Sequence, residues 1–227
     1  MHLQIHCSRH GANTERLRGY SMKVGILGGT FNPVHLGHLV LAEECLYQLN
    51  LDKVVFIPAG LPPHKTIEGD IEHSDRLNMM RLALQGHKRF EISTYEIDKN
   101  GLSYSIETIK HLKSKYGELA ELFFITGADS GKDLSLWKDF KDILRFTTFV
   151  IANRPGVPVG DGPARSISDH TKDNLTRVTI PNIEISSTMI RSRVKHHQPI
   201  DFYLPPKVVK YIRNKGLYSR GRPCVGP

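Results

Sequence analysis

The 227-residue sequence contains only three cysteines, Cys7, Cys45 and Cys224, and no two of them form a CxxC pair. This scattered, odd-numbered set argues against a disulfide framework and against a structural zinc site. No apolar run approaches the roughly 20 residues needed to cross a bilayer. Residues 1–21 lack the apolar core of a secretory signal. We therefore expect a cytoplasmic protein without a membrane partner.

Basic residues are in moderate excess, with 31 Lys and Arg against 23 Asp and Glu and a net charge of +8. Part of this excess lies in the two ends of the chain, so the body is only mildly basic. Such a body suits an anionic small molecule as well as nucleic acid. Because no Arg–Lys stripe with interleaved aromatic residues is present, we expect no nucleic-acid partner, and a nucleic-acid-binding module is a minor alternative.

Short apolar runs alternate with segments of helical periodicity through the chain, which predicts strands alternating with helices. The predicted strands are 23–27, 53–57, short strands near 90–98, 121–126, 147–152 and a strand near 177–180. The predicted helices are 37–49, 73–85, 103–116, one near 138–145, 187–196 and 205–215. This alternation predicts an α/β fold: one Rossmann-like, doubly wound parallel sheet with helices on both faces and a C-terminal helical segment.

The expected domain is 22–218, preceded by a disordered extension at 1–21 and followed by a flexible tail at 219–227. Residues 153–176, rich in glycine, proline and polar residues, are expected to form a surface excursion of this single domain. In doubly wound sheets, ligands bind at the carboxyl ends of strands, close to the point where the strand order reverses. The two strands that run into glycine, 23–27 and 121–126, are therefore expected to position the site.

Residues 28–38, GGTFNPVHLGH, combine features of an anion-binding loop. Gly28 and Gly29 allow a close backbone approach, Thr30 offers a hydroxyl, and the helix that follows presents its positive N-terminal end. His35 and His38 can donate to phosphate oxygens from the start of that helix. The loop matches neither GxxxxGK[ST] nor GxGxxG. Two histidines without a third ligand at suitable spacing do not predict a metal site.

Several segments resemble known enzymes. GGTFNPVHLGH and ISSTMIRSR at 185–193 resemble the two signatures of the HxGH nucleotidyltransferase superfamily. Five further segments resemble the bacterial nicotinate mononucleotide adenylyltransferase family, so that the resemblance covers about 22–218: FIPAGLPPHK (56–65), GLSYSIET (101–108), FITGADS (124–130), ANRPG (152–156) and LPPKVVKYIRNKGLY (204–218).

The resemblance implies an enzyme of NAD biosynthesis that binds ATP and nicotinate mononucleotide and releases nicotinate adenine dinucleotide and pyrophosphate. It implies in-line attack of the mononucleotide phosphate on the α-phosphorus of ATP, with Mg²⁺ bound to ATP and no covalent enzyme intermediate. The alternatives are a nicotinamide mononucleotide or phosphopantetheine adenylyltransferase, a cytidylyltransferase, or a non-catalytic nucleotide sensor. The sequence leaves the oligomeric state open, a homo-oligomer included.

The resemblance also assigns roles to residues. The implied catalytic residues are His35, His38 and Arg191. The implied ATP and phosphate ligands are Gly28, Gly29, Thr30, Phe31, Gly127, Asp129, Arg154, Ser187 and Thr188. The implied nicotinate mononucleotide ligands are Lys65, Ser103, Tyr104, Ser105 and Trp137, whose indole would stack on the pyridine ring. Asn32 stands where the superfamily often has Asp, and we expect this position only to shape the loop.

Overall fold

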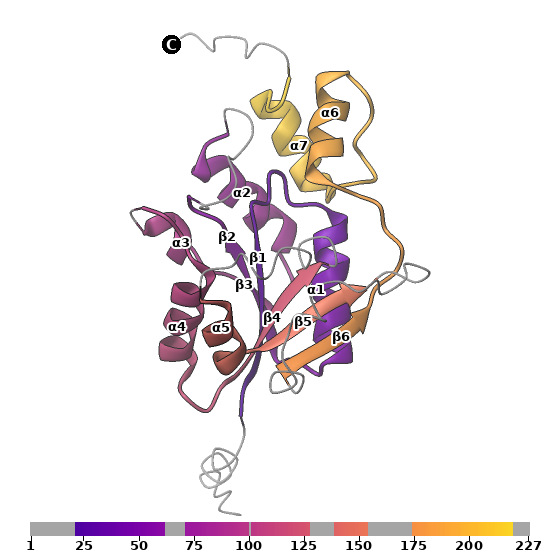
Figure 1. Cartoon of the computed structure of the whole chain (residues 1–227). Coiled ribbons are helices and arrows are strands. Elements are labelled where there is room, and N and C mark those ends of the chain that lie inside the picture. The colour runs from indigo at the N-terminus through magenta and orange to yellow at the C-terminus, as the bar shows by residue number, and fades with distance from the viewer. Residues whose placement is uncertain (1–20, 62–70, 100, 128–138, 154–173, 220–227) are drawn as a thin grey trace, which may run out of the picture.

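A computed structural model describes residues 21–61, 71–99, 101–127, 139–153 and 174–219 (Figure 1). Six strands form one sheet in the order β3-β2-β1-β4-β5-β6, with every neighbouring pair parallel. They are β1 (Lys23–Gly29), β2 (Lys53–Pro58), β3 (Phe90–Ile92), β4 (Glu121–Gly127), β5 (Thr148–Asn153) and β6 (Leu175–Thr179). The chain reverses its direction across the sheet between β1 and β4, as in a doubly wound fold. The predicted fold class is confirmed.

Helices cover both faces of the sheet, because successive side chains of each buried strand point to opposite faces. Val24 and Ile26 of β1 pack in one core with α4 and α5. Leu27 packs in a second core with α1, α2, α6 and α7. The helices are α1 (Leu36–Gln48), α2 (His73–Leu84), α3 (Tyr95–Asp98), α4 (Ser105–Tyr116), α5 (Phe140–Phe146), α6 (Ser187–Lys195) and α7 (Pro206–Lys215).

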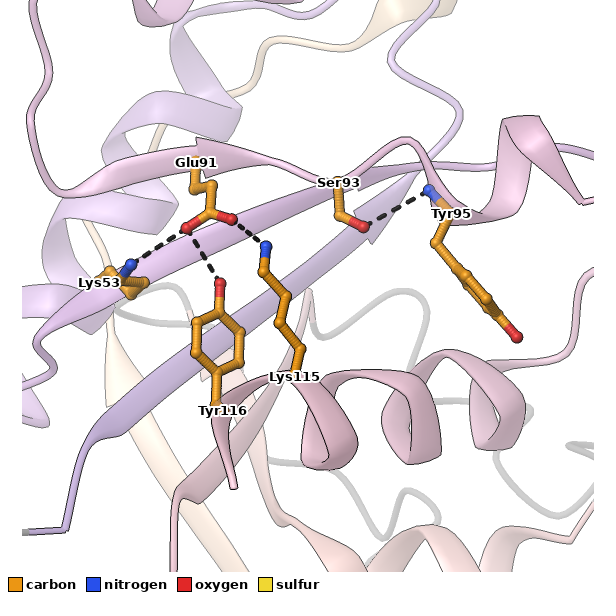
Figure 2. Close-up of polar contacts among 6 residues, drawn as sticks. All are labelled: Lys53, Glu91, Ser93, Tyr95, Lys115 and Tyr116. Atoms are coloured by element: carbon orange, nitrogen blue, oxygen red, sulfur yellow. Dashed lines mark hydrogen bonds and ion pairs between the residues drawn. The ribbon is translucent and has the colours of Figure 1, made fainter. Parts of the chain in front are cut away.

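The predicted strands near 90–98 are wrong in their second half. Only Phe90–Ile92 pairs with β2, whereas Tyr95–Asp98 forms the short helix α3. The Ser93 hydroxyl accepts a hydrogen bond from the Tyr95 N–H at 3.4 Å (Figure 2). The Thr94 hydroxyl donates to the Asp98 carboxylate one turn later. These local side-chain bonds favour a helical turn over continued strand pairing.

A charged cluster joins the edge of the sheet to the end of α4 (Figure 2). The Glu91 carboxylate of β3 accepts hydrogen bonds from Lys53 Nζ of β2 at 3.1 Å, from the Tyr116 hydroxyl at 3.0 Å and from Lys115 Nζ. Burial alone would raise the pKa of Glu91, but these three donors outweigh it and lower the pKa below its ordinary value. The cluster fastens the end of α4 to β2 and β3, at the side of the sheet away from β6.

Three predictions about organisation lie mostly outside the described ranges: the N-terminal extension 1–21, the tail 219–227 and the excursion 153–176. Within those ranges, no helix is both long enough and apolar enough to span a membrane.

Candidate functional site

Glycines form the ends of the two central strands. Strand β1 continues through Gly28 and Gly29, two residues beyond its predicted end, and pairs them with Ile57 and Pro58. A Cβ added to Gly29 would lie 3.2 Å from the Phe31 ring, so this glycine makes room for that ring. A Cβ added to Gly28 or Gly127 would meet no atom of the described chain within 4 Å. These two glycines leave the backbone accessible at the carboxyl ends of β1 and β4.

The loop after β1 is held in an unusual conformation by contacts from the C-terminal part of the chain. Phe31 is buried with a φ of 46°, and the Asn32–Pro33 peptide is cis. The Tyr218 hydroxyl donates to Asn32 Oδ1 at 2.7 Å, and Arg191 Nη1 donates to the Asn32 carbonyl at 2.9 Å. Asn32 is 2 % exposed. Its side chain therefore makes a contact that fits the predicted loop-shaping role.

The two histidines stand together at the start of α1. His35 is the N-cap residue, and its backbone N–H donates to His38 Nδ1 at 3.2 Å. The two rings stack with their centroids 3.7 Å apart, and the Phe31 ring packs edge-on against His38 at 4.9 Å. A Cβ on Gly37 would lie 3.1 Å from His35 Nδ1. The glycine between the histidines therefore makes room for the stack.

Both imidazoles are held in the neutral form by burial. Desolvation lowers the pKa of His35 from 6.5 to about 4. The pKa of His38 is lowered well below 6.5, first by desolvation and second by repulsion from His35. Because His38 Nδ1 accepts an N–H, its neutral ring carries the proton on Nε2 and can donate from that atom. His35 Nδ1 is buried with no hydrogen-bond partner in the described part of the chain.

The second signature segment contacts the first directly. Helix α6 begins at Ser187, as predicted, with Ser186 as the N-cap that accepts from the Met189 N–H at 3.1 Å. The Ser187 hydroxyl donates to the Pro33 carbonyl at 2.8 Å. The Arg191 guanidinium donates to the Thr188 hydroxyl at 3.2 Å, in addition to its hydrogen bond to the Asn32 carbonyl. The N-terminus of α6 and the loop after β1 therefore form one wall.

Three of the five residues predicted for the acceptor nucleotide lie at the start of α4. Ser103 is buried, Tyr104 is the N-cap residue, and Ser105 is the first helical residue. The Ser103 N–H donates to the carbonyl of Leu61, just after β2, at 3.0 Å, which brings this segment to the carboxyl end of the sheet. Four other predicted ligands lie outside the described residues: Lys65, Asp129, Trp137 and Arg154.

Two residues that support the site were missed by the sequence analysis. Arg76 of α2 is fully buried and donates to the Thr30 carbonyl. It occupies the same helical face as Met79, Met80 and Ala83, and a charged residue on an apolar face is a signal that could have revealed it. Tyr218, which bonds to the first loop, offered no such signal because its contact depends on tertiary structure.

The donor set of the site favours anions over a protein-bound metal ion. Backbone N–H groups, neutral imidazoles and a guanidinium supply hydrogen-bond donors, whereas Mg²⁺ prefers oxygen ligands. Among the residues with described positions, no group of three or more His, Cys, Asp or Glu side chains lies close enough to hold a metal ion.

Comparison with known proteins gives consistent matches. The cytidylyltransferase-like family matches residues 26–193. Curated relatives named "Probable nicotinate-nucleotide adenylyltransferase" match most of the chain, and two of them illustrate the similarity. The protein from Thermoanaerobacter sp. (strain X514) is 43% identical over 88% of this chain and 95% of its own length. The protein from Clostridium perfringens (strain 13 / Type A) is 41% identical over 87% of this chain and 98% of its own length.

A solved structure shares the fold at low sequence identity. Plasmodium falciparum nicotinic acid mononucleotide adenylyltransferase, complexed with NaAD, superposes with a TM-score of 0.67 and 17% identity. The superposition covers 87% of this chain and 97% of that one.

Proposed function

The chain belongs to the cytidylyltransferase-like family, and specifically to the nicotinate-nucleotide adenylyltransferases, and on this premise we propose that it joins nicotinate mononucleotide to ATP. The products are nicotinate adenine dinucleotide and pyrophosphate, so the reaction is a step of NAD biosynthesis. The substrates are both anionic, which suits a site made of hydrogen-bond donors and a mildly basic protein body.

The reaction requires little covalent chemistry from the protein. An oxygen of the mononucleotide 5′-phosphate forms a bond to the α-phosphorus of ATP, while the bond from that phosphorus to the bridging oxygen of the β-phosphate breaks. The attacking oxygen is already anionic, so no activated serine or cysteine is needed. Catalysis consists of aligning two polyanions and stabilising the charge that develops on the α-phosphate and on the leaving pyrophosphate.

Residues of the two signature segments bind different phosphates of ATP. His38 donates from Nε2 to an oxygen of the α-phosphate as a neutral imidazole, and His35 supports its ring by stacking. Arg191 and the N-terminus of α6, with Ser187 and Thr188, bind the β- and γ-phosphates through positive charge and N–H groups. Gly28 and Gly127 allow the nucleotide to approach the strand ends closely. Mg²⁺ would be held mainly by the phosphate oxygens of ATP and by water, and the chemistry it would supply there is neutralisation of phosphate charge.

One observation carries the proposal. The signature segments lie about 150 residues apart in sequence, and Ser187 and Arg191 hydrogen-bond to the adjacent carbonyls of Pro33 and Asn32. This contact places the hydrogen-bond donors of the two segments side by side next to β1. The strand order reverses at this point, and doubly wound sheets bind nucleotides there.

The test is pyrophosphate release from ATP and magnesium with three acceptors in parallel: nicotinate mononucleotide, nicotinamide mononucleotide and phosphopantetheine. We expect release with nicotinate mononucleotide to be at least tenfold faster than with the other two, and to stop when EDTA removes magnesium. Faster release with another acceptor would assign the chain to a different transferase activity. No release with any acceptor would support a non-catalytic nucleotide sensor instead.

A further inference from the structure

A single buried guanidinium connects the segments that follow the neighbouring strands β1 and β2. Arg76 of α2 is 0 % exposed. Its Nη1 donates to the Thr30 carbonyl and its Nη2 donates to the Ala59 carbonyl, each at 2.7 Å. The Ala59 N–H in turn donates to the Gly29 carbonyl at 2.8 Å. The loop that carries the two histidines is therefore tied to the neighbouring strand end at two successive residues.

The surroundings of this guanidinium are unusual for a residue that only supports packing. Both of its hydrogen-bond acceptors are main-chain carbonyls, and its buried Nε has no partner within the described ranges. Burial also lowers the pKa of Arg76 from its ordinary value. Removing a cation from water is unfavourable, and an aliphatic side chain would fill the same space beside Met79 and Met80 without that penalty. The benefit of arginine at this position must come from the two carbonyls that it bridges.

The two hydrogen bonds of Arg76 form a bridge that determines the orientation of one peptide group in the loop after β1, which we call the phosphate loop (residues 30–35). In a trans peptide the C=O and the following N–H point in opposite directions. Because the Thr30 carbonyl points at Arg76, the Phe31 N–H points away from the buried guanidinium. Phe31, the residue that follows this carbonyl, has a φ of 46°, and its ring packs against His38 at 4.9 Å. A change at Arg76 would therefore reach both an N–H of the loop and the imidazole that donates to the α-phosphate.

We propose that Arg76 is a positioning residue for adenylyl transfer: its guanidinium bridges the carbonyls that follow β1 and β2, and this bridge sets the phosphate loop and His38 in their reactive arrangement. The proposal rests on the adenylyltransferase activity proposed above, and it assigns Arg76 no contact with either substrate. A planar guanidinium can bond two divergent carbonyls at once, whereas a lysine ammonium is a point donor that cannot reproduce this geometry.

The test compares Arg76→Lys and Arg76→Met with a matched pair, Arg81→Lys and Arg81→Met, on the exposed face of the same helix. Thermal unfolding followed by circular dichroism defines a temperature at which each variant is fully folded, and kinetics are measured there. We expect kcat of Arg76→Lys to fall at least tenfold, with the KM values for ATP and nicotinate mononucleotide changed less than threefold. Arg76→Met should lose more, and both Arg81 variants should match the wild type.

The outcomes separate this inference from the proposed function. A wild-type protein without turnover would refute the proposed function, whatever the variants do. Normal wild-type turnover together with a normal kcat in Arg76→Lys would overturn the positioning role. If neither Arg76 variant folds at any temperature while the Arg81 variants do, Arg76 supports the fold rather than the loop, and the inference is wrong.

Discussion

Acid should weaken the folded state of this protein through its stacked histidine pair. Burial lowers the pKa of His35 from 6.5 to about 4, so the folded protein keeps this imidazole neutral while the unfolded chain takes up a proton. Because the pKa of His35 is lower in the folded protein than in the unfolded chain, its contribution to the free energy of unfolding is fully present above pH 6.5. That contribution is lost as the pH falls toward 4. His38, whose pKa is lowered by desolvation and by His35, acts in the same direction.

The size of the effect follows from the shift of His35. A difference of one bound proton changes the free energy of unfolding by about 1.36 kcal/mol for each pH unit. Over the window from pH 6.5 to about 4, His35 alone should lower the free energy of unfolding by about 3 kcal/mol. This is a large fraction of the ~5–15 kcal/mol that stabilises a typical domain.

The assay is urea unfolding between pH 7.5 and pH 4.5 for the wild type, His35→Asn and His197→Asn. Asparagine suits the N-cap position of His35 and also tolerates the positive φ of the exposed His197, so both variants should fold. We expect the free energy of unfolding of His35→Asn to fall by about 3 kcal/mol less than that of His197→Asn over this range. Parallel curves for the two variants would refute the reasoning, because they would show that His35 binds protons equally in the folded and unfolded states.

Four further variants test turnover and packing. His38→Ala should stay folded, as judged by circular dichroism, and lose at least tenfold in the rate of pyrophosphate release because its Nε2 donor is gone; near-normal release would contradict the mechanism. Gly28→Ala should unfold at the wild-type temperature but release pyrophosphate more slowly, since its methyl group would project where the nucleotide approaches. Its counterpart Gly60→Ala should lose about 2 kcal/mol of stability or more in urea unfolding, because its Cβ would lie 1.9 Å from a backbone carbonyl oxygen. Asn32→Asp should keep its rate within threefold of the wild type, because a carboxylate oxygen can still accept the Tyr218 hydroxyl; a larger change in pyrophosphate release would assign a role to charge at this position.

The fold could be predicted because its elements carry strong local patterns. Residues 122–125 of β4 form an unbroken apolar run, since parallel strands are buried on both faces. Helix α7 places Val208, Val209 and Ile212 on one buried stripe. The segment 95–98 was predicted wrongly because side-chain bonds from Ser93 and Thr94 outweighed the strand pattern. Local hydrogen bonding of this kind is not visible in periodicity.

The motifs of the candidate site could be predicted from the sequence, but the residues that hold its first loop in shape could not. GGTFNPVHLGH follows β1, and ISSTMIRSR contains the start of α6. The structure brings these two segments into contact. The residues that hold the loop in shape, Arg76 and Tyr218, come from α2 and from the end of the chain. The apolar face of α2 could mark Arg76 as buried, but the carbonyls that Arg76 meets and the partner of Tyr218 depend on which elements pack together.

The bond between Tyr218 and Asn32 spans 186 residues, and it has a consequence for synthesis on the ribosome. The phosphate loop is translated early, yet its last hydrogen-bond partner emerges only after α7 has been made. Until then a nascent chain can assemble the sheet but lacks the phenol that holds the Asn32 side chain. A truncated translation product would therefore be a nearly complete fold with an unfinished site. The protein acquires its nucleotide site only once the segment that follows α7 has been made.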